Sequence, residues 1–323
     1  MTETAHAFWT VAHGRGELRP TSLPGDADGM VTVSAHYSGI SRGTESLVFA
    51  GQVPTSEFER MRAPFQEGDF PFPVKYGYAS VGRVEQGPDS LLERIVFCLY
   101  PHQDRYRVPV EAVTLLPDGL PPARAVLAAN METALNACWD AGIAPGDRVT
   151  VIGAGVVGAL VAWLSASVPG TDTTLVDINP ARADLAARLG LRFAKPDQAE
   201  DNQDVVIHAS GSEAGLVRAL QLAGFEARIV ELSWFGSHRP ALPLGQAFHS
   251  QRLELRCSQV GHLPAHRRAR WDHGRRLAKA LELLTDPRLD TLISGESDFR
   301  DLPRVMPELL AGCADALCHR VKY

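Results

Sequence analysis

Long hydrophobic runs and lysine are scarce in this sequence. The longest apolar runs, such as residues 159–164, are far shorter than the roughly 20 residues that a membrane-spanning helix needs. Residues 1–8 include Glu3 and His6 and no long apolar stretch, so we expect no signal peptide. Only four of the 32 basic residues are lysine, a bias to which we attach no function. We expect a protein with no membrane partner.

Cysteines are also few, and they are scattered. The odd number and the wide spacing argue against a disulfide framework and favour reduced thiols in a cytoplasmic protein. A formal net charge of -6 further argues against binding to nucleic acid or to an anionic membrane surface. The five cysteines are Cys98, Cys138, Cys257, Cys313 and Cys318.

The length of 323 residues exceeds what one hydrophobic core of ordinary size supports, so we expect two domains. Hydrophobic residues make up 45% of the chain and charged residues 22%, which is typical of a globular protein. The first third is rich in Gly and Pro, and short alternating or β-branched runs predict strands at 30–36, 79–85 and 94–100. This part of the chain is predicted to be an irregular β domain.

After a Pro- and Gly-rich break at 117–122, a helix is predicted over 124–141, and strands then alternate with helices. This alternation predicts an α/β fold with a doubly wound parallel sheet. In the tail, an amphipathic helix is predicted over 267–284, and strands at 289–293 and 317–322 are predicted to return to the first domain. The expected strands of the sheet are 148–152, 173–177, 191–194, 204–209, 227–232 and 253–260, and the expected helices between them are 156–167, 181–189 and 213–222.

A glycine-rich motif stands between the first of these strands and its helix. Residues 149–158 read V-T-V-I-G-A-G-V-V-G, with the G-x-G-x-x-G glycines at Gly153, Gly155 and Gly158. These glycines allow a tight turn, a close approach of a diphosphate to the backbone, and packing of the helix on the strand. The N–H groups of the helix that begins at Val156 and Val157 then face the phosphates. The pattern predicts a dinucleotide site.

An acidic residue follows at the expected distance. Asp177 ends the next strand, 19 residues after Gly158, where a carboxylate accepts hydrogen bonds from the adenosine ribose and repels a 2′-phosphate. We therefore expect NAD(H) as the cofactor, with Ile178 beside Asp177 in the site. Arg182 is the contrary signal, because an arginine there can bind a 2′-phosphate or stack on adenine.

Further motifs flank this site on both sides. They are S-G-I-S-R-G-T-E at 38–45, G-Y-A-S-V-G at 77–82, E-T-A-L-N-A at 132–137, A-P-G-D-R-V at 144–149 and V-D-I-N-P-A-R at 176–182. These motifs resemble those of the medium-chain dehydrogenases/reductases, the zinc-type alcohol dehydrogenase superfamily, and lie nearest to a bacteriochlorophyllide hydroxyethyl dehydrogenase-like subgroup. The resemblance implies a Rossmann domain at 122–261 inserted into a GroES-like substrate domain made of 1–121 and 262–323, and a homodimer. It also implies that Thr133, Ser210 and Gly211 face the cofactor.

The zinc ligands of that superfamily are missing from this chain. Ser41 stands where the family has a cysteine, Tyr78 and Ala79 stand where it has His and Glu, and residues 128–130 offer no Cys, Asp or Glu. Zinc needs three or four N, S or O ligands in tetrahedral reach. We expect no metal, and hence catalysis that does not depend on zinc.

Without a metal, a hydrogen-bond donor must polarise the substrate oxygen. Tyr78 occupies the ligand position of the family and is the first candidate, although a strand tyrosine also serves as a packing residue. Ser41 is the second, with a helix cap formed by Ser41 or Thr44 as its structural alternative. His102 is the third candidate, as a proton shuttle or else as a surface histidine.

Three functions remain open at this point. The first is zinc-independent hydride transfer between NAD(H) and an alcohol/ketone pair, on a small-molecule substrate whose identity the sequence leaves open. The second is reduction of an activated C=C bond, as in quinone or enoyl reductases. The third is a catalytically silent dinucleotide-binding redox sensor. Turnover on a panel of alcohols and enones separates the three.

Overall fold

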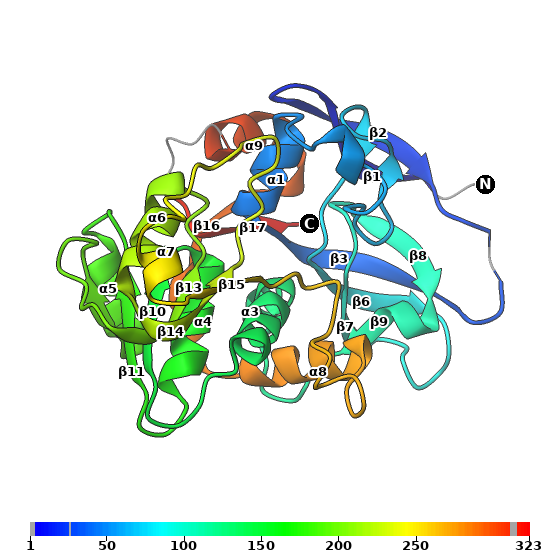
Figure 1. Ribbon diagram of the computed structural model, residues 1–323. Coiled ribbons are helices and arrows are strands. Elements are labelled where there is room, and N and C mark those ends of the chain that lie inside the picture. Colours follow the sequence, from blue (N-terminus) through cyan, green and yellow to red (C-terminus); the bar gives the residue numbers. More distant parts are fainter. Residues whose placement is uncertain (1–3, 26, 311–314) are drawn as a thin grey trace. The chain divides into compact units, whose positions relative to one another are not determined.

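The computed structural model describes residues 4–25, 27–310 and 315–323, and the chain divides into two compact units (Figure 1). Unit 1 is Met1–Ala129 with Leu277–Tyr323, and unit 2 is Asn130–Arg276. The sequence predicted these boundaries at 121/122 and 261/262, so both lie further along the chain than expected. The second boundary is displaced because Arg276, which is 2% exposed, is held by groups of unit 2.

Unit 1 is built on two sheets. A four-stranded sheet has the order β2-β1-β5-β4, and a seven-stranded sheet has the order β16-β17-β3-β6-β7-β9, with β8 paired to β3. Its strands are β1 Thr4–Ala12, β2 Arg15–Ser22, β3 Met30–Ile40, β4 Glu67–Gly68, β5 Val74–Lys75, β6 Ser80–Gln86, β7 Ile95–Cys98, β8 Arg105–Pro109, β9 Val113–Leu115, β16 Ile293–Asp298 and β17 Cys318–Lys322. Its helices are α1 Arg42–Phe49, α2 Pro122–Ala125 and α9 Leu302–Leu310.

The tail returns to unit 1, where it joins the seven-stranded sheet. Strand β17 runs antiparallel to β3, with Val321 opposite Ser38, and β16 runs parallel to β17 (Figure 1). The strand predicted at 289–293 is wrong over most of its length. A 3-10 helix covers Pro287–Leu292 instead, because Pro287 follows Asp286, whose carboxylate caps the turn by accepting from the Arg288 N–H.

Unit 2 contains a six-stranded parallel sheet with the order β12-β11-β10-β13-β14-β15. This is the doubly wound order of dinucleotide-binding domains, so the predicted α/β fold class is confirmed. Its central strands are apolar because helices cover both faces of such a sheet. The strands are β10 Arg148–Ile152, β11 Asp172–Val176, β12 Arg192–Ala194, β13 Gln203–His208, β14 Ala223–Glu231 and β15 Glu254–Cys257, and the helices are α4 Val156–Ala166, α5 Arg182–Leu189, α6 Glu213–Leu222 and α7 Ala247–Ser250.

Two predicted helices differ from the observed ones. The helix expected over 124–141 is divided into α2 and α3 Ala128–Ala141, because the Leu127 N–H bonds the Arg124 carbonyl in a tighter three-residue turn. The tail helix expected from 267 begins later, as α8 His273–Leu283. Asp272 caps it by accepting from the Arg275 N–H, which fixes the start of the helix.

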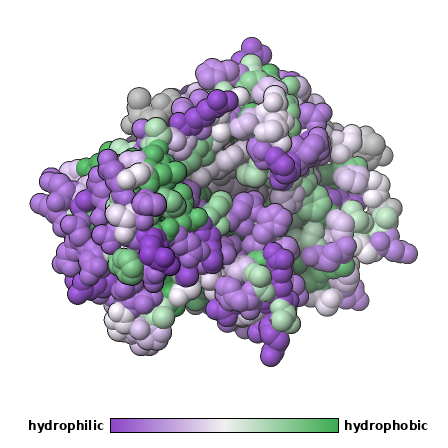
Figure 2. All heavy atoms as spheres, viewed as in Figure 1, coloured by the Kyte–Doolittle hydropathy of each residue, from purple (hydrophilic) through white to green (hydrophobic). Residues whose placement is uncertain are grey.

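The face of the chain drawn in Figure 2 is largely polar. On the face drawn in Figure 2, hydrophilic residues cover most of the area and hydrophobic residues form separate groups. Within the described ranges, no helix combines the length and the apolar character that crossing a membrane requires. The described cysteines, which are Cys98, Cys138, Cys257 and Cys318, are free thiols, and Cys313 lies outside the described residues.

Candidate functional site

The G-x-G-x-x-G motif forms the turn from β10 into α4. Gly153 has φ +107°, and a Cβ added to it would lie 2.7 Å from the backbone nitrogen of Ser210. A Cβ at Gly158 would lie 1.8 Å from the Gly153 carbonyl oxygen. Both positions therefore require glycine, the first for its backbone conformation and the second for close packing of the helix on the turn.

The middle glycine is different, because a Cβ at Gly155 would meet no atom within 4 Å. Gly155 is the extended N-cap residue of α4, and the first turn of this helix carries no acidic side chain. The free N–H groups at Val156 and Val157 and the positive end of the helix dipole therefore stand beside open space. This arrangement can bind a phosphate.

Asp177 ties the turn to the end of β11. One carboxylate oxygen accepts from the Ala154 N–H at 2.7 Å, and the other accepts from the Asn179 N–H at 2.8 Å. The carboxylate thus has a structural role that the motif alone does not reveal, and each oxygen keeps lone-pair capacity for a ribose hydroxyl. Next to it, Ile178 is 84% exposed, and Arg182 is the first residue of α5.

The ends of β13 and β14 lie beside the turn. Ser210 and Gly211 follow β13, and the Gly211 N–H donates to the Ser233 hydroxyl at 3.0 Å. Phe235 packs on the core of the sheet and lines a cavity of about 200 Å³. Trp234 is half-buried. The sequence did not single out His208 and Glu231, a buried pair at the same strand ends.

Helix α3 carries the E-T-A-L-N-A motif. Two of its polar residues hold Arg276: Glu132 accepts at 3.0 Å and Asn136 at 2.5 Å. Burial raises the pKa of Glu132, although the charge of Arg276 opposes the shift. Thr133, expected beside the cofactor, is half-buried on the same helix. The motif therefore has a packing role in addition to any contact with a ligand.

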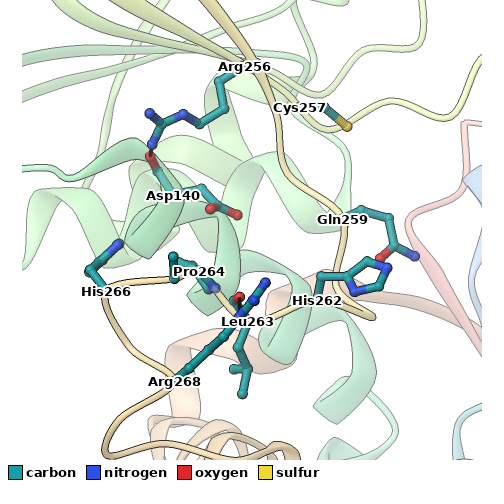
Figure 3. A pocket seen from close by; sticks show the side chains of 10 residues that line it. Asp140, Arg256, Cys257, Gln259, His262, Leu263, Pro264, His266 and Arg268 are labelled. Atoms are coloured by element: carbon teal, nitrogen blue, oxygen red, sulfur yellow. Dashed lines mark hydrogen bonds between the residues drawn. The ribbon is translucent and has the colours of Figure 1, made fainter.

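A larger cavity of about 600 Å³ opens between α3 and the segment that follows β15 (Figure 3). An Arg256 Nη1–H donates to the Asp140 carbonyl oxygen at 3.1 Å, and the Arg268 Nε–H donates to the Leu263 carbonyl oxygen at 2.8 Å. The positive and negative side chains that line this cavity can hold a polar small molecule. No sequence motif marks this cavity, because most of the lining comes from an irregular loop. The lining residues are Asp140, Arg256, Cys257, Gln259, His262, Leu263, Pro264, Ala265, His266 and Arg268.

In unit 1, a buried polar network surrounds His102. The ring Nε2 lies 3.0 Å from Glu45 Oε2, and Nδ1 lies 2.7 Å from the Ser38 hydroxyl. His102 is 1% exposed and Glu45 3% exposed, so the alternative of a surface histidine is wrong. The Ser38 hydroxyl also bonds the Tyr323 hydroxyl at 2.9 Å. Three segments that are distant in the chain, at 38–45, 102 and 323, thus meet in one network.

Tyr78 adjoins this network. Its hydroxyl bonds those of Ser41 and Thr44, while burial and the charge of Glu45 raise its pKa to about 12. The phenol therefore stays protonated at neutral pH and can donate a hydrogen bond. Ser41 is the N-cap residue of α1, but its side chain makes no capping bond. The cap interaction runs the other way, because Glu45 accepts from the Ser41 N–H at 2.7 Å.

These residues do not suit zinc. Ser41 and Tyr78 offer neutral hydroxyls, which are poor ligands beside thiolate and imidazole. Glu45 and His102 face each other and are already engaged with the Ser41 N–H and with Ser38. Among the described residues, no three His, Cys, Asp or Glu side chains gather in a way that could hold a metal ion.

The predicted site residues form two sets. The three catalytic candidates meet in unit 1, with Tyr78 bonded to Ser41 and His102 linked to Ser41 through Glu45. The cofactor candidates lie in unit 2, mostly at the carboxyl ends of parallel strands. They are Gly153, Gly155, Val156, Val157, Gly158, Asp177, Ile178, Arg182, Thr133, Ser210 and Gly211.

Known proteins similar to this chain are dehydrogenases and their relatives. An uncharacterised zinc-type alcohol dehydrogenase-like protein of Haemophilus influenzae is 31% identical over 150 residues, which are 43% of this chain and 44% of that protein. The match thus spans less than half of the relative's length. No family model matches the chain.

Solved structures match over essentially the whole chain. L-Idonate 5-dehydrogenase of Escherichia coli has a TM-score of 0.82 at 14% identity, covering 100% of this chain and 99% of that one. A zinc-binding dehydrogenase of Sinorhizobium meliloti bound to NADP has a TM-score of 0.79 at 16% identity, covering 99% and 100%. An Escherichia coli alcohol dehydrogenase in complex with NADH has 0.79 at 15%, covering 99% of both chains. The chain has the fold of these dehydrogenases, with GroES-like and Rossmann-type parts.

Proposed function

We propose that this protein is an oxidoreductase of the zinc-type alcohol dehydrogenase-like superfamily that transfers a hydride between NAD(H) and an alcohol/ketone pair. The observation that carries the proposal is the turn at Gly153–Gly158, with open space at Gly155 and Asp177 bonded to the Ala154 N–H. The dehydrogenase fold supports the same conclusion.

The residues around the turn suit a nicotinamide dinucleotide. The α4 N-terminus would hold the diphosphate, Asp177 the adenosine ribose, and the exposed Ile178 side chain an apolar face of the adenine. When bound, the nicotinamide supplies the hydride donor or acceptor. One similar structure contains NADP and another NADH, so the preference for NAD(H) depends on Asp177. Its charge disfavours a 2′-phosphate.

On the substrate side, we assign Tyr78 as the donor that polarises the substrate oxygen in place of a metal. Its raised pKa keeps the phenol proton available at neutral pH, and Ser41 and Thr44 orient the hydroxyl. His102 is a positioning residue, because both of its ring nitrogens are engaged with Glu45 and Ser38. Glu45 in turn fixes the Ser41 backbone, so a change at His102 reaches Tyr78 through Ser41.

Turnover with defined substrates tests this function. The purified protein is incubated with NADH or NADPH and a panel of ketones, aldehydes, enones and quinones, and with NAD⁺ or NADP⁺ and the matching alcohols. NAD-dependent interconversion of alcohols and carbonyls supports the proposal. Activity confined to C=C bonds identifies a reductase of activated alkenes, and tight dinucleotide binding without turnover on either class identifies a sensor.

We further propose that the protein is a cytoplasmic homodimer. Strand β15 is an edge of the parallel sheet, with exposed residues along most of its length. Light scattering in solution tests this assembly, and a monomeric mass at micromolar concentration would exclude it.

A further inference from the structure

A buried hydrogen-bonded relay lies directly beside the glycine-rich turn. His208 is the last residue of β13 and Glu231 the last of β14, and the two are paired neighbours in the sheet. His208 Nδ1 lies 2.6 Å from Glu231 Oε2, and Nε2 lies 2.6 Å from the Ser210 hydroxyl. We call Glu231, His208 and Ser210 the serine relay.

The surroundings are shaped to hold this relay. The Phe235 ring stacks on the imidazole, with ring centroids 6.2 Å apart, and His208 is 0% exposed. A Cβ at Gly215 of α6 would lie 2.4 Å from the Ser210 hydroxyl and 2.8 Å from His208 Nε2, so glycine there makes room for the relay. Glu231 is 13% exposed, and Ser210 lies at the surface.

The hydrogen-bond partners determine which atoms of the serine relay carry a hydrogen. The second oxygen of Glu231 accepts from the Ser233 N–H at 2.6 Å, so the carboxylate accepts on both sides and His208 Nδ1 carries a hydrogen. In neutral His208, Nε2 is then an acceptor and the Ser210 O–H donates inward to it. The Ser210 oxygen meanwhile accepts from the Ser212 hydroxyl at 2.9 Å and offers no hydrogen to a ligand.

Protonation of His208 reverses this arrangement. The added proton sits on Nε2, which donates to the Ser210 oxygen, and the Ser210 hydrogen becomes available to another acceptor, either the Ser212 hydroxyl or a ligand. The imidazolium charge is balanced by Glu231, so the buried pair is stabilised. Ser210 is then a hydrogen-bond donor at the rim of the turn, since its backbone nitrogen adjoins Gly153.

We propose that the serine relay makes dinucleotide binding proton-linked: Ser210 donates to an acceptor oxygen of the bound dinucleotide when His208 is protonated. The inference rests on the proposed function, because it requires that this turn bind a dinucleotide. Affinity for the dinucleotide rises as the pH falls, and binding takes up a proton. His208 and Glu231 are positioning residues, and Ser210 is the contact residue.

Other titratable groups nearby could also make dinucleotide binding depend on pH, and the test must distinguish them from His208. His238 and Arg239 line the small cavity with Phe235, and Glu213 begins α6. The charges of Glu231 and Asp140 both act on the Cys257 thiol and raise its pKa, after burial as the larger cause. Of these groups, His238 is the exposed histidine and hence the matched control for His208.

The test is titration calorimetry of NADH and NADPH binding to the full chain from pH 6 to 8.5, in buffers of different ionisation enthalpy. We expect NADH affinity to fall about tenfold across this range, with uptake of up to about one proton on binding. In His208→Gln and in Ser210→Ala the pH dependence and the proton uptake are lost. Both remain in His238→Gln.

The outcomes distinguish this inference from the function on which it rests. NADH binding that is independent of pH, or a pH dependence that persists in both His208→Gln and Ser210→Ala, overturns the relay and leaves the oxidoreductase proposal intact. Loss of the pH dependence in His238→Gln alone also overturns it. Failure of the wild-type chain to bind either dinucleotide at any pH overturns both. Ser210→Ala leaves the buried pair in place, so a folding defect in His208→Gln does not block the test.

Discussion

The hydrogen bonds that hold Arg276 provide a stringent test of the packing of unit 2. The guanidinium is 2% exposed, and it donates to Glu132, to Asn136 and to the Val260 carbonyl oxygen. In Arg276→Met, the side chain keeps its length but leaves the Glu132 carboxylate buried without its counter-charge. Removing one partner of a buried ion pair costs about 3–5 kcal/mol of unfolding free energy.

The loss depends on pH in a defined direction. Burial already raises the pKa of Glu132 in the wild type, and in Arg276→Met no guanidinium opposes that shift. An acid whose pKa is raised in the folded state does not destabilise the protein below its unfolded pKa of about 4.3. The unfolding free energy of the protein then falls as the pH rises toward and through the folded pKa. The deficit of the variant relative to the wild type is therefore full at pH 8 and smaller at pH 5.

Urea unfolding followed by tryptophan fluorescence measures this deficit. Four of the five tryptophans, namely Trp139, Trp163, Trp234 and Trp271, belong to unit 2, so the signal reports mainly on it. The control is Arg275→Met, an exposed arginine over the Trp271 ring, with an expected loss of about 0.5–1 kcal/mol. Glu132→Gln combined with Arg276→Met recovers most of the stability. A loss in Arg276→Met below about 1 kcal/mol, or one equal at both pH values, would refute the reasoning.

Three further predictions concern the proposed chemistry. Tyr78→Phe lowers kcat by about 10²–10³-fold, because one donor to the substrate oxygen is lost, while calorimetry finds NADH affinity unchanged. Full activity of this variant would make Tyr78 a packing residue. Asp177→Asn removes the charge that opposes a 2′-phosphate and narrows the gap between NADPH and NADH affinity by roughly 5- to 150-fold. A wild type that prefers NADPH would contradict this assignment. We expect elemental analysis to find no stoichiometric zinc and chelators to leave turnover unchanged, because Ser41 and Tyr78 are poor zinc ligands. Zinc at one per chain would refute it.

Sequence patterns within short segments predicted the elements of the fold whose conformation is determined by neighbouring residues. The strand–turn–helix around Gly153 follows from glycine spacing, and the parallel sheet follows from alternating strands and helices. The sequence analysis did not predict the β1–β2 hairpin, since β2 is a polar edge strand without an alternating apolar pattern.

The interactions that define the sites were mostly beyond the sequence. Arg276 and Glu132 are 144 positions apart, and His102 and Glu45 are 57 apart, so no spacing rule relates them. Asp177 was singled out for a ribose, whereas its bonds to Ala154 and Asn179 depend on how the turn closes. Such contacts are set by packing, which periodicity does not record.

The interrupted topology of unit 1 has a consequence for synthesis on the ribosome. Strand β17 pairs with β3 through Lys322 and Tyr37, so this edge of the sheet stays open until translation reaches the last strand. At a synthesis rate of about 5–20 residues per second, the time between the synthesis of β3 and that of β17 is on the order of 15 to 60 s. Unit 2 is continuous and can fold during this time. A nascent chain that stalls before β17 leaves the edge of β3 exposed, and this favours aggregation or chaperone capture.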